Sequence, residues 1–166
     1  MTSEEGRRRL TVLLPGSYDP VTCGHTDVIR RASETFGHVY VVIFNNPEKN
    51  YRFSLEDRLR MLSLATEEFP NVIVSYGAGL VIDYAHEHEV HLIVKGYRNA
   101  ADLAYEEKQA AWNLAHGGVP TELWPAAVDQ KDVSSTAVRA RLDRGDDTDG
   151  LLPPAVADYI RYIKTR

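Results

Sequence analysis

The sequence has a single cysteine, Cys23, among its 166 residues, so no internal disulfide can form. One free thiol is typical of a protein in the reducing cytoplasm, where we expect this one to lie. No apolar run approaches the ~18–20 residues that a membrane-spanning helix needs, so no membrane association is predicted. Basic residues are in deficit, with 19 against 24 acidic ones and a formal charge of −5. That balance argues against a nucleic-acid partner.

What remains is the composition of an ordinary folded domain. Hydrophobic residues make up 43% of the chain and charged residues 26%, which excludes wholesale disorder. Residues 1–9 are polar and end in three arginines before a short apolar run at 10–14. That run is too short for the hydrophobic part of an export signal. We therefore predict a flexible N-terminal tail over residues 1–9 and a single domain over 10–166 that ends in a helical segment.

Short apolar runs alternate with helical periodicity along the whole chain. Near-continuous β-branched runs such as 39–44 suit strands that are covered on both faces of a parallel sheet. Apolar residues at spacings of three and four indicate amphipathic helices between them. This alternation predicts an α/β fold with right-handed crossovers. The predicted strands are 10–14, 38–44, 72–76, 92–94 and 122–124, and the predicted helices are 24–35, 55–69, 80–88, 102–115, 135–143 and 155–164.

The first polar motif, residues 15–25, follows the first predicted strand and leads into a helix. In open α/β sheets, ligands bind beyond the carboxyl ends of strands, where helix N-termini offer free N–H groups to anions. Gly16 and Gly24 allow the backbone to approach a ligand closely. His25 is placed in the first helical turn, where it can donate to a phosphate. The motif is neither a Walker loop nor GxGxxG. Taken alone, a single histidine of this kind is more often structural.

Two further motifs follow later strands. Lys95 and Arg98 flank Gly96 just beyond the fourth predicted strand, a pattern that suits a polyanion. The helix that follows carries a polar stripe, for which a solvated face is the simpler interpretation; its members are Asp102, Glu106, Gln109 and Asn113. Three hydroxyl residues, 134–136, open a later helix and can cap it or bind phosphate oxygens. Capping alone is the simpler interpretation of an isolated run of this kind.

Together, these motifs resemble those of nucleotidylyltransferases. Residues 16–25 fit the pattern G-[ST]-[FY]-D-P-x-T-x-G-H, residues 95–106 resemble [RK]-G-[LY]-R-x-x-x-D-x-x-Y-E, and residues 133–139 resemble I-S-S-[ST]-x-[VI]-[RK]. Several of these relatives have histidine at the position of Thr22. The threonine form of the motif resembles that of phosphopantetheine adenylyltransferases. The resemblance covers residue 10 to the end of the chain. It implies a Rossmann-like fold with a five-stranded parallel sheet in the order 3-2-1-4-5.

The resemblance also implies an activity. ATP and 4'-phosphopantetheine would react to give dephospho-coenzyme A and pyrophosphate, by in-line attack without a covalent enzyme intermediate. Mg²⁺ would be carried with ATP, with few or no protein ligands, and the protein would form a homohexamer built as a dimer of trimers. The residues to which the resemblance gives a catalytic role are His25, Lys49, Arg98 and Ser17.

The resemblance assigns binding residues as well. For ATP they are Ser17, Tyr18, His25, Gly96, Tyr97, Arg98, Glu106, Gln130, Lys131, Asp132, Val133, Ser134, Ser135 and Thr136. For phosphopantetheine they are Ser17, Lys49, Val81 and Lys95. The family often has arginine where Lys95 stands, and lysine keeps the charge but not a bidentate grip. Asn99 and Ala100 also depart from the family's common residues.

Three other interpretations remain open. The chain could be a nicotinamide-mononucleotide adenylyltransferase or another nucleotidylyltransferase, a non-catalytic nucleotide sensor, or a structural subunit. Residues 86–91 contain three histidines but cross from a helix into a strand, so we predict no metal site there. Cys23 has no base at an obvious spacing and is interpreted as a spacer rather than a nucleophile.

Overall fold

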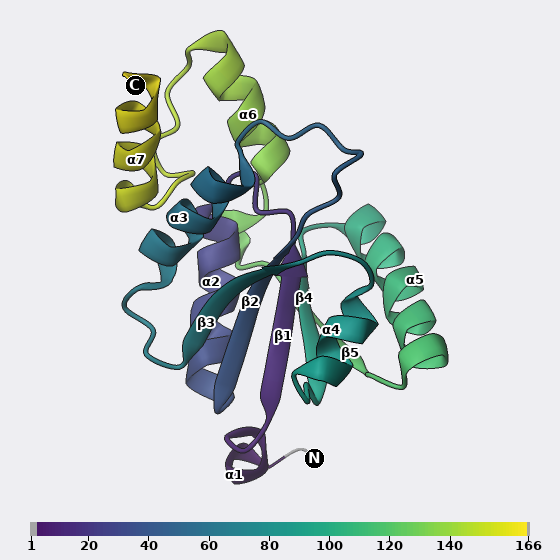
Figure 1. The fold of residues 1–166 in the computed structure, drawn as a ribbon. Coiled ribbons are helices and arrows are strands. Elements are labelled where there is room, and N and C mark those ends of the chain that lie inside the picture. The colour runs from purple at the N-terminus through teal and green to yellow at the C-terminus, as the bar shows by residue number, and fades with distance from the viewer. Residues whose placement is uncertain (1–2, 166) are drawn as a thin grey trace.

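Five parallel strands form the central sheet in the order β3-β2-β1-β4-β5, as the resemblance implied (Figure 1). The computed structural model describes residues 3–165. The strands lie where β-branched and aromatic residues are concentrated, and β1 is central, with β2 and β4 on either side. Because all five strands run in one direction, their carboxyl ends meet at one edge of the sheet. The strands are β1 Thr11–Gly16, β2 His38–Phe44, β3 Val72–Gly77, β4 Leu92–Tyr97 and β5 Thr121–Pro125.

Helices connect the strands, and side chains that the sequence supplies cap several of them. Thr22, Ser54, Asn99 and Ser134 each accept a hydrogen bond from the backbone N–H three residues on, which satisfies one free donor of the first turn. The α-helices are α1 Glu4–Arg7, α2 Cys23–Thr35, α3 Leu55–Thr66, α4 Val81–Glu87, α5 Ala100–Gly117, α6 Ser135–Arg144 and α7 Pro154–Lys164, with a 3₁₀ helix at Val128–Gln130.

The two faces of the sheet bury separate hydrophobic cores. Alternate strand residues such as Val12 and Leu14 pack on one face with residues of α2, α3, α6 and α7. Leu13, Val42 and Ile93 point to the other face, where α4 and neighbouring segments cover them. These strand residues are almost wholly inaccessible to solvent. The alternation follows from the two-residue period of a strand, and burial on both faces explains the near-continuous apolar runs.

The N-terminal segment differs from the sequence prediction. A flexible tail was predicted over residues 1–9, but Glu4–Arg7 form helix α1, capped by Ser3. The Arg7 guanidinium makes two hydrogen bonds to the Glu122 carboxylate at 2.9 and 3.2 Å. The partner lies 115 residues along the chain, so local sequence could not reveal it. Residues 1 and 2 of this prediction, and residue 166 of the predicted domain, lie outside the described residues.

Within residues 3–165, no helix is both long and apolar enough to cross a membrane. The same residues contain no group of three histidine, cysteine, aspartate or glutamate side chains placed to hold a metal ion. The histidines of 86–91 instead have separate partners. His86 bonds to the Gly117 carbonyl oxygen, His88 stacks on Tyr84, and His91 accepts the Thr11 N–H.

Candidate active site

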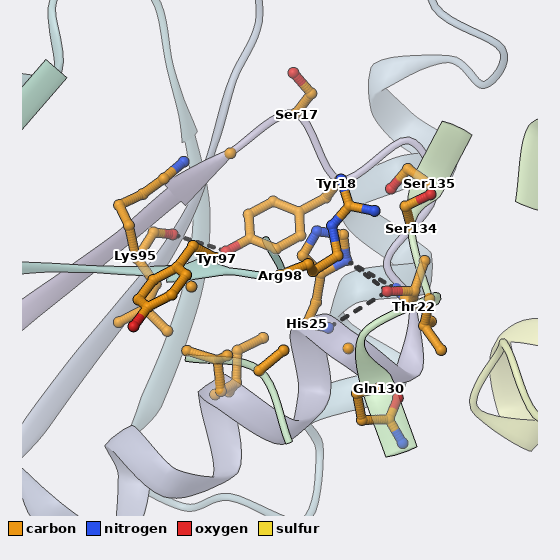
Figure 2. Close-up of a pocket in the computed structure, with 18 of the residues that line it drawn as sticks. Ser17, Tyr18, Thr22, His25, Lys95, Tyr97, Arg98, Gln130, Ser134 and Ser135 are labelled. Carbon is orange, nitrogen blue, oxygen red and sulfur yellow. Dashed lines mark hydrogen bonds between the residues drawn. The ribbon is translucent and has the colours of Figure 1, made fainter. Parts of the chain in front are cut away.

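The segment between β1 and α2 fixes the ring of His25. The Thr22 backbone N–H donates to His25 Nδ1 at 3.0 Å, and the Thr22 side chain accepts the His25 backbone N–H (Figure 2). Because Nδ1 accepts a hydrogen bond, the ring proton of the neutral imidazole resides on Nε2. His25 is therefore held as a hydrogen-bond donor through Nε2, and the helix cap itself selects this tautomer.

Tyr18 packs beside that ring. It has a positive φ of 47°, and its hydroxyl donates to the Leu14 carbonyl oxygen at 3.0 Å. The ring centroids of Tyr18 and His25 are 4.9 Å apart. Gly16 leaves the space for this arrangement, because a Cβ there would lie 3.0 Å from the tyrosine ring. The Tyr18 hydroxyl is thus already engaged, and what it offers the site is the surface of its ring.

The charges around His25 favour its neutral form. Burial lowers the pKa of His25 to about 4, and the nearby cations Lys95 and Arg98 act in the same direction. The imidazole is therefore an uncharged donor at neutral pH. Burial also raises the pKa of the Cys23 thiol, which keeps it protonated and supports its interpretation as a spacer.

A cavity of about 310 Å³ opens above His25 at the carboxyl edge of the sheet. Polar groups from three segments converge on it: the loop after β1, the end of β4, and the start of α6 (Figure 2). Gly24 and Gly96 line it with backbone alone, and Val28, Ala126 and Val133 supply an apolar part. A cavity that combines an apolar part with several groups able to bind anions suits a nucleotide.

The cationic and hydroxyl groups of this cavity have defined supports. Arg98 Nε lies 3.0 Å from Asp102 Oδ2, and Arg139 Nη1 donates to the Asp19 carbonyl oxygen at 2.9 Å. Ser134 caps α6, and the Ser135 hydroxyl donates to the Pro20 carbonyl oxygen. The run of hydroxyl residues 134–136 therefore both caps α6 and lines the cavity. From the sequence alone, these two roles were alternatives.

A second cavity, of about 250 Å³, adjoins the first. Residues that line both cavities form their common wall, which consists of Pro15, Gly16, Ser17 and Lys95. Lys95 Nζ lies 3.6 Å from Glu106 Oε2 and 3.4 Å from the Pro15 carbonyl oxygen. The far wall of the second cavity comes from α5, with Phe44, Val81 and Thr121 nearby.

The polar stripe of α5 is more than a solvated face. Glu106, Gln109 and Asn113 all line the second cavity, which corrects the simpler interpretation made from the sequence. Periodicity placed these residues on one side of the helix but could not say what that side meets. The opposite wall of this cavity includes residues 15–17, at the end of β1 and just after it, which lie more than 80 residues away along the chain.

The comparisons with known proteins agree with this geometry. Residues 13–141 match the cytidylyltransferase-like family. The chain is 39% identical over 160 residues to the phosphopantetheine adenylyltransferase of Symbiobacterium thermophilum, covering 95% of this chain and 99% of that protein. The phosphopantetheine adenylyltransferases of Rubrobacter xylanophilus and Synechococcus sp. are 37% and 39% identical over 155 residues, which cover 93% of this chain and 94% and 93% of theirs. The chain belongs to the phosphopantetheine adenylyltransferase family.

Most residues that the sequence linked to this family meet at the two cavities. The larger cavity is lined by Ser17, Tyr18, His25, Lys95, Gly96, Tyr97, Arg98, Gln130, Val133, Ser134, Ser135 and Thr136. Ser17, Val81, Lys95 and Glu106 line the smaller one, so Glu106 lies away from the cavity that the other predicted ATP-binding residues share. Lys49, Lys131 and Asp132 line neither cavity and are exposed.

The sequence did not predict two residues at the site of this adenylyltransferase: Asp19, which lines the larger cavity, and Arg58, which supports the loop after β1. Asp19 is 4% exposed, and its carboxylate accepts the backbone N–H groups of Arg52 and Phe53 at 2.8 and 2.9 Å. Arg58 is 2% exposed and donates to the Ser17 carbonyl oxygen at 3.1 Å. Arg58 does carry a signal in the sequence, because a charged residue there interrupts the apolar stripe of α3 between Leu55 and Leu62.

Proposed function

We propose that this protein transfers the adenylyl group of ATP to 4'-phosphopantetheine, giving dephospho-coenzyme A and pyrophosphate. One observation carries the proposal: two cavities, one suited to a nucleotide, share a wall that contains Ser17 and Lys95. A reaction between two phosphate-bearing substrates requires such a junction. The relatives named above bear this activity in their names, and the chain covers almost their whole length.

The proposed mechanism is attack by the phosphopantetheine phosphate on the α-phosphorus of ATP, in line with the departing pyrophosphate. No side-chain nucleophile is needed, so the protein acts by positioning the substrates and stabilising negative charge. His25 donates a hydrogen bond from Nε2 to the phosphoryl oxygens as charge develops on them. Ser17 orients the attacking phosphate from the common wall. Arg98 and Lys95 supply positive charge on either side.

Lys49 enters the mechanism as a further cation at the transfer centre. It is exposed in a turn between β2 and α3, and it lines neither cavity in the structure. The turn spans residues 46–50, and the backbone N–H groups of Arg52 and Phe53, just after it, donate to Asp19 in the loop after β1. Closure of this turn over bound substrates would bring the lysine to the phosphates, as happens with loops that complete a site on binding.

We propose that Mg²⁺ accompanies ATP and is held mainly by phosphate oxygens. Asp19, a buried carboxylate in the lining of the larger cavity, already accepts two backbone N–H groups and has Arg139 Nη1 4.0 Å away, so its negative charge is partly balanced by the protein itself. Mg²⁺ in such enzymes keeps several waters and uses substrate phosphates as ligands. When bound, the ion neutralises phosphate charge. Omitting Mg²⁺ should abolish transfer, while substitutions of single acidic residues should not alter the Mg²⁺ requirement.

The assembly proposed for the protein is a homohexamer in the cytoplasm. Apolar side chains that remain exposed on the edge strand β3 and the segment after it support self-association, namely Ile73, Tyr76 and Leu80. On α5, Tyr105 and Trp112 are also exposed. Light scattering coupled to size-exclusion chromatography tests this directly, and a monomer at micromolar concentration would contradict it.

Pyrophosphate release with Mg-ATP tests the function, with 4'-phosphopantetheine and nicotinamide mononucleotide compared as acceptors. Release with phosphopantetheine alone is the expected result. Release only with the mononucleotide would retain the transfer chemistry and overturn the acceptor. Binding of ATP without release from either acceptor would favour the nucleotide sensor.

A further inference from the structure

Arg58 is the largest side chain among those that are almost completely buried, at 2% exposure. It lies on α3 between apolar residues that pack against the main core. Burying a guanidinium is costly, and a hydrophobic side chain of similar volume often gives equal or greater stability. Stability alone therefore does not account for an arginine here. Its contacts indicate what it is for.

The guanidinium of Arg58 bonds to three separate segments. Nη1 donates to the Ser17 carbonyl oxygen at 3.1 Å, Nε donates to the Phe53 carbonyl oxygen at 3.1 Å, and Nη2 donates to Asn45 Oδ1. Ser17 belongs to the common wall of the two cavities, whereas Asn45 and Phe53 flank the turn that carries Lys49. One planar group thus ties the junction of the cavities to both ends of that turn.

Neighbouring contacts complete this framework. The guanidinium carbon of Arg58 lies 3.9 Å from the centroid of the Tyr51 ring, and the Tyr51 hydroxyl accepts the Asn46 N–H at 2.9 Å. Asp19 holds the same side of the turn through its bonds to Arg52 and Phe53. The turn itself is closed by the Lys49 N–H bond to the Asn46 carbonyl oxygen. The base of the Lys49 turn is therefore fixed to the loop after β1, while the lysine at its tip is exposed.

We propose that Arg58 is a positioning residue that fixes the Lys49 turn relative to Ser17, and hence the place at which Lys49 meets the reacting phosphates. The proposal rests on the function proposed above. Arg58 touches no substrate, because neither cavity includes it in its lining. Its effect passes through the Ser17 carbonyl oxygen and the two ends of the turn. A misplacement of about 1 Å in such a framework costs roughly 10²-fold in rate.

The primary test compares Arg58→Met, which keeps the volume and removes the hydrogen bonds, with Arg58→Lys, which keeps the charge but not the fork. Arg60→Met is the matched control, because Arg60 is exposed on the same helix. We expect Arg58→Met to lower kcat about 10²-fold. The Kd for Mg-ATP should stay within about threefold, since the groups lining the nucleotide cavity are unchanged. Arg58→Lys should recover only part of kcat.

A double-mutant cycle with Lys49→Ala separates positioning from a general structural role. If Arg58 acts through the Lys49 turn, Arg58→Met lowers kcat much less in a Lys49→Ala background than in the wild type. Fully additive losses would overturn the proposal, as would an unchanged kcat in either single variant. Should Arg58→Met fail to fold, Asn45→Ala removes one acceptor of the guanidinium and enters the same cycle.

Hydrogen–deuterium exchange gives a readout that needs no acceptor substrate. Arg58→Met should accelerate exchange in residues 45–53 and leave α5 unchanged, whereas Arg60→Met should alter neither. Unchanged exchange in 45–53 would refute the framework whatever the activity. If the wild type fails to transfer adenylyl groups while exchange responds as expected, the proposed function is at fault and the framework around Arg58 stands.

Discussion

The two ends of the sheet use the same residue types for different purposes. At the carboxyl end, His25 Nδ1 accepts the backbone N–H of Thr22, and at the amino end His91 Nδ1 accepts that of Thr11, at 3.0 and 2.9 Å. Both rings are therefore fixed by a backbone donor. His25 lines the nucleotide-sized cavity together with the cations Lys95 and Arg98, while His91 is exposed just before β4. The same hydrogen bond can serve chemistry only where other groups of a cavity surround the ring, as they do at His25.

Charged groups show the same contrast. At the amino end, Arg7 and Glu122 satisfy each other, Trp124 donates to the same carboxylate, and the Arg7 guanidinium lies over the Phe36 ring. At the carboxyl end, Lys95 and Arg98 also have carboxylate partners, but both line a cavity as well. Charges that pair and pack at one end stabilise the fold. Charges that pair beside a cavity can exchange a partner for a ligand.

The largest expected effect comes from His25→Ala. Removing this donor should leave the fold intact and lower kcat by about 10²–10³-fold, roughly 3 kcal/mol of transition-state stabilisation, as for a lost oxyanion-hole donor. His91→Ala is the matched control and should leave kcat unchanged. Steady-state pyrophosphate release measures both. Equal activity of the two variants would contradict the view that only the histidine at the carboxyl end of the sheet takes part in transfer.

Lys95→Met should have the next largest effect. A lost charge-assisted hydrogen bond is worth about 1.5–3 kcal/mol, so kcat/KM for 4'-phosphopantetheine should fall by roughly 10–100-fold. Arg98→Met should instead weaken Mg-ATP more than the acceptor, because Arg98 lines only the larger cavity. Titrating each substrate at a saturating level of the other distinguishes the two. A Lys95→Met variant with unchanged acceptor kinetics would remove the lysine from the acceptor site.

Arg7→Met should affect stability and not activity. The pair with Glu122 is half-buried, so the free energy of unfolding should fall by about 1 kcal/mol. Arg8→Met is the control, since Arg8 is largely exposed, and should change the unfolding free energy by less than about 0.5 kcal/mol. Urea unfolding followed by circular dichroism measures both. A loss of activity in folded Arg7→Met would show that the amino end influences the site.

The dependence of the unfolding free energy on acidic pH gives a second test of the pair between Arg7 and Glu122. Burial alone would raise the pKa of Glu122, but hydrogen bonds from Arg7 and Trp124 outweigh it and hold that pKa below its ordinary value. A lowered carboxyl pKa stabilises the fold above the ordinary pKa near 4.5, and that stability is lost as pH falls through the lowered value. In Arg7→Met, the loss of stability below pH 4.5 should therefore be shallower than in the wild type.

The smallest expected effect is the dependence of activity on pH between 6 and 8. With a pKa of about 4, His25 is neutral throughout this range, so its titration should leave kcat/KM unchanged. Protonation removes the acceptor at Nδ1, and activity should fall as pH drops toward 4. Nitrogen chemical shifts of His25 by NMR should show a proton on Nε2 at pH 7. A proton on Nδ1 would refute the tautomer assigned from the Thr22 contact.

The elements that sequence periodicity predicted are those of the structure, to within a few residues at their ends. These predictions are correct because burial on both faces of a parallel sheet requires continuous apolar runs such as 38–44, and such runs are visible in the sequence. The placement of His25 in the first turn of α2 was also predicted from the sequence, and the structure adds that Thr22 caps this helix. These features depend on residues that are close together in the chain, and a sequence pattern describes such residues directly.

The features that the sequence did not predict depend on contacts between distant segments. Helix α1 is fixed by Arg7 on Glu122, and the α5 stripe lines a cavity whose opposite wall includes residues of β1. Arg58 joins residues 17, 45 and 53 from a position that periodicity assigns to the core. Lys49 was assigned through resemblance alone, and in the described structure its turn lies outside both cavities.

The common wall of Pro15, Gly16, Ser17 and Lys95 also bears on inhibition. Two ligands that meet at such a wall can be joined there by a short bridge, and the joined molecule gains the effective concentration of each half at the other's site, typically millimolar for a short linker. The proposed product, dephospho-coenzyme A, is itself a nucleotide joined through phosphate to a pantetheine arm, so it should bind more tightly than either half and compete with both substrates. For the same reason, a substitution at Ser17 should give cross-resistance to compounds directed at either cavity.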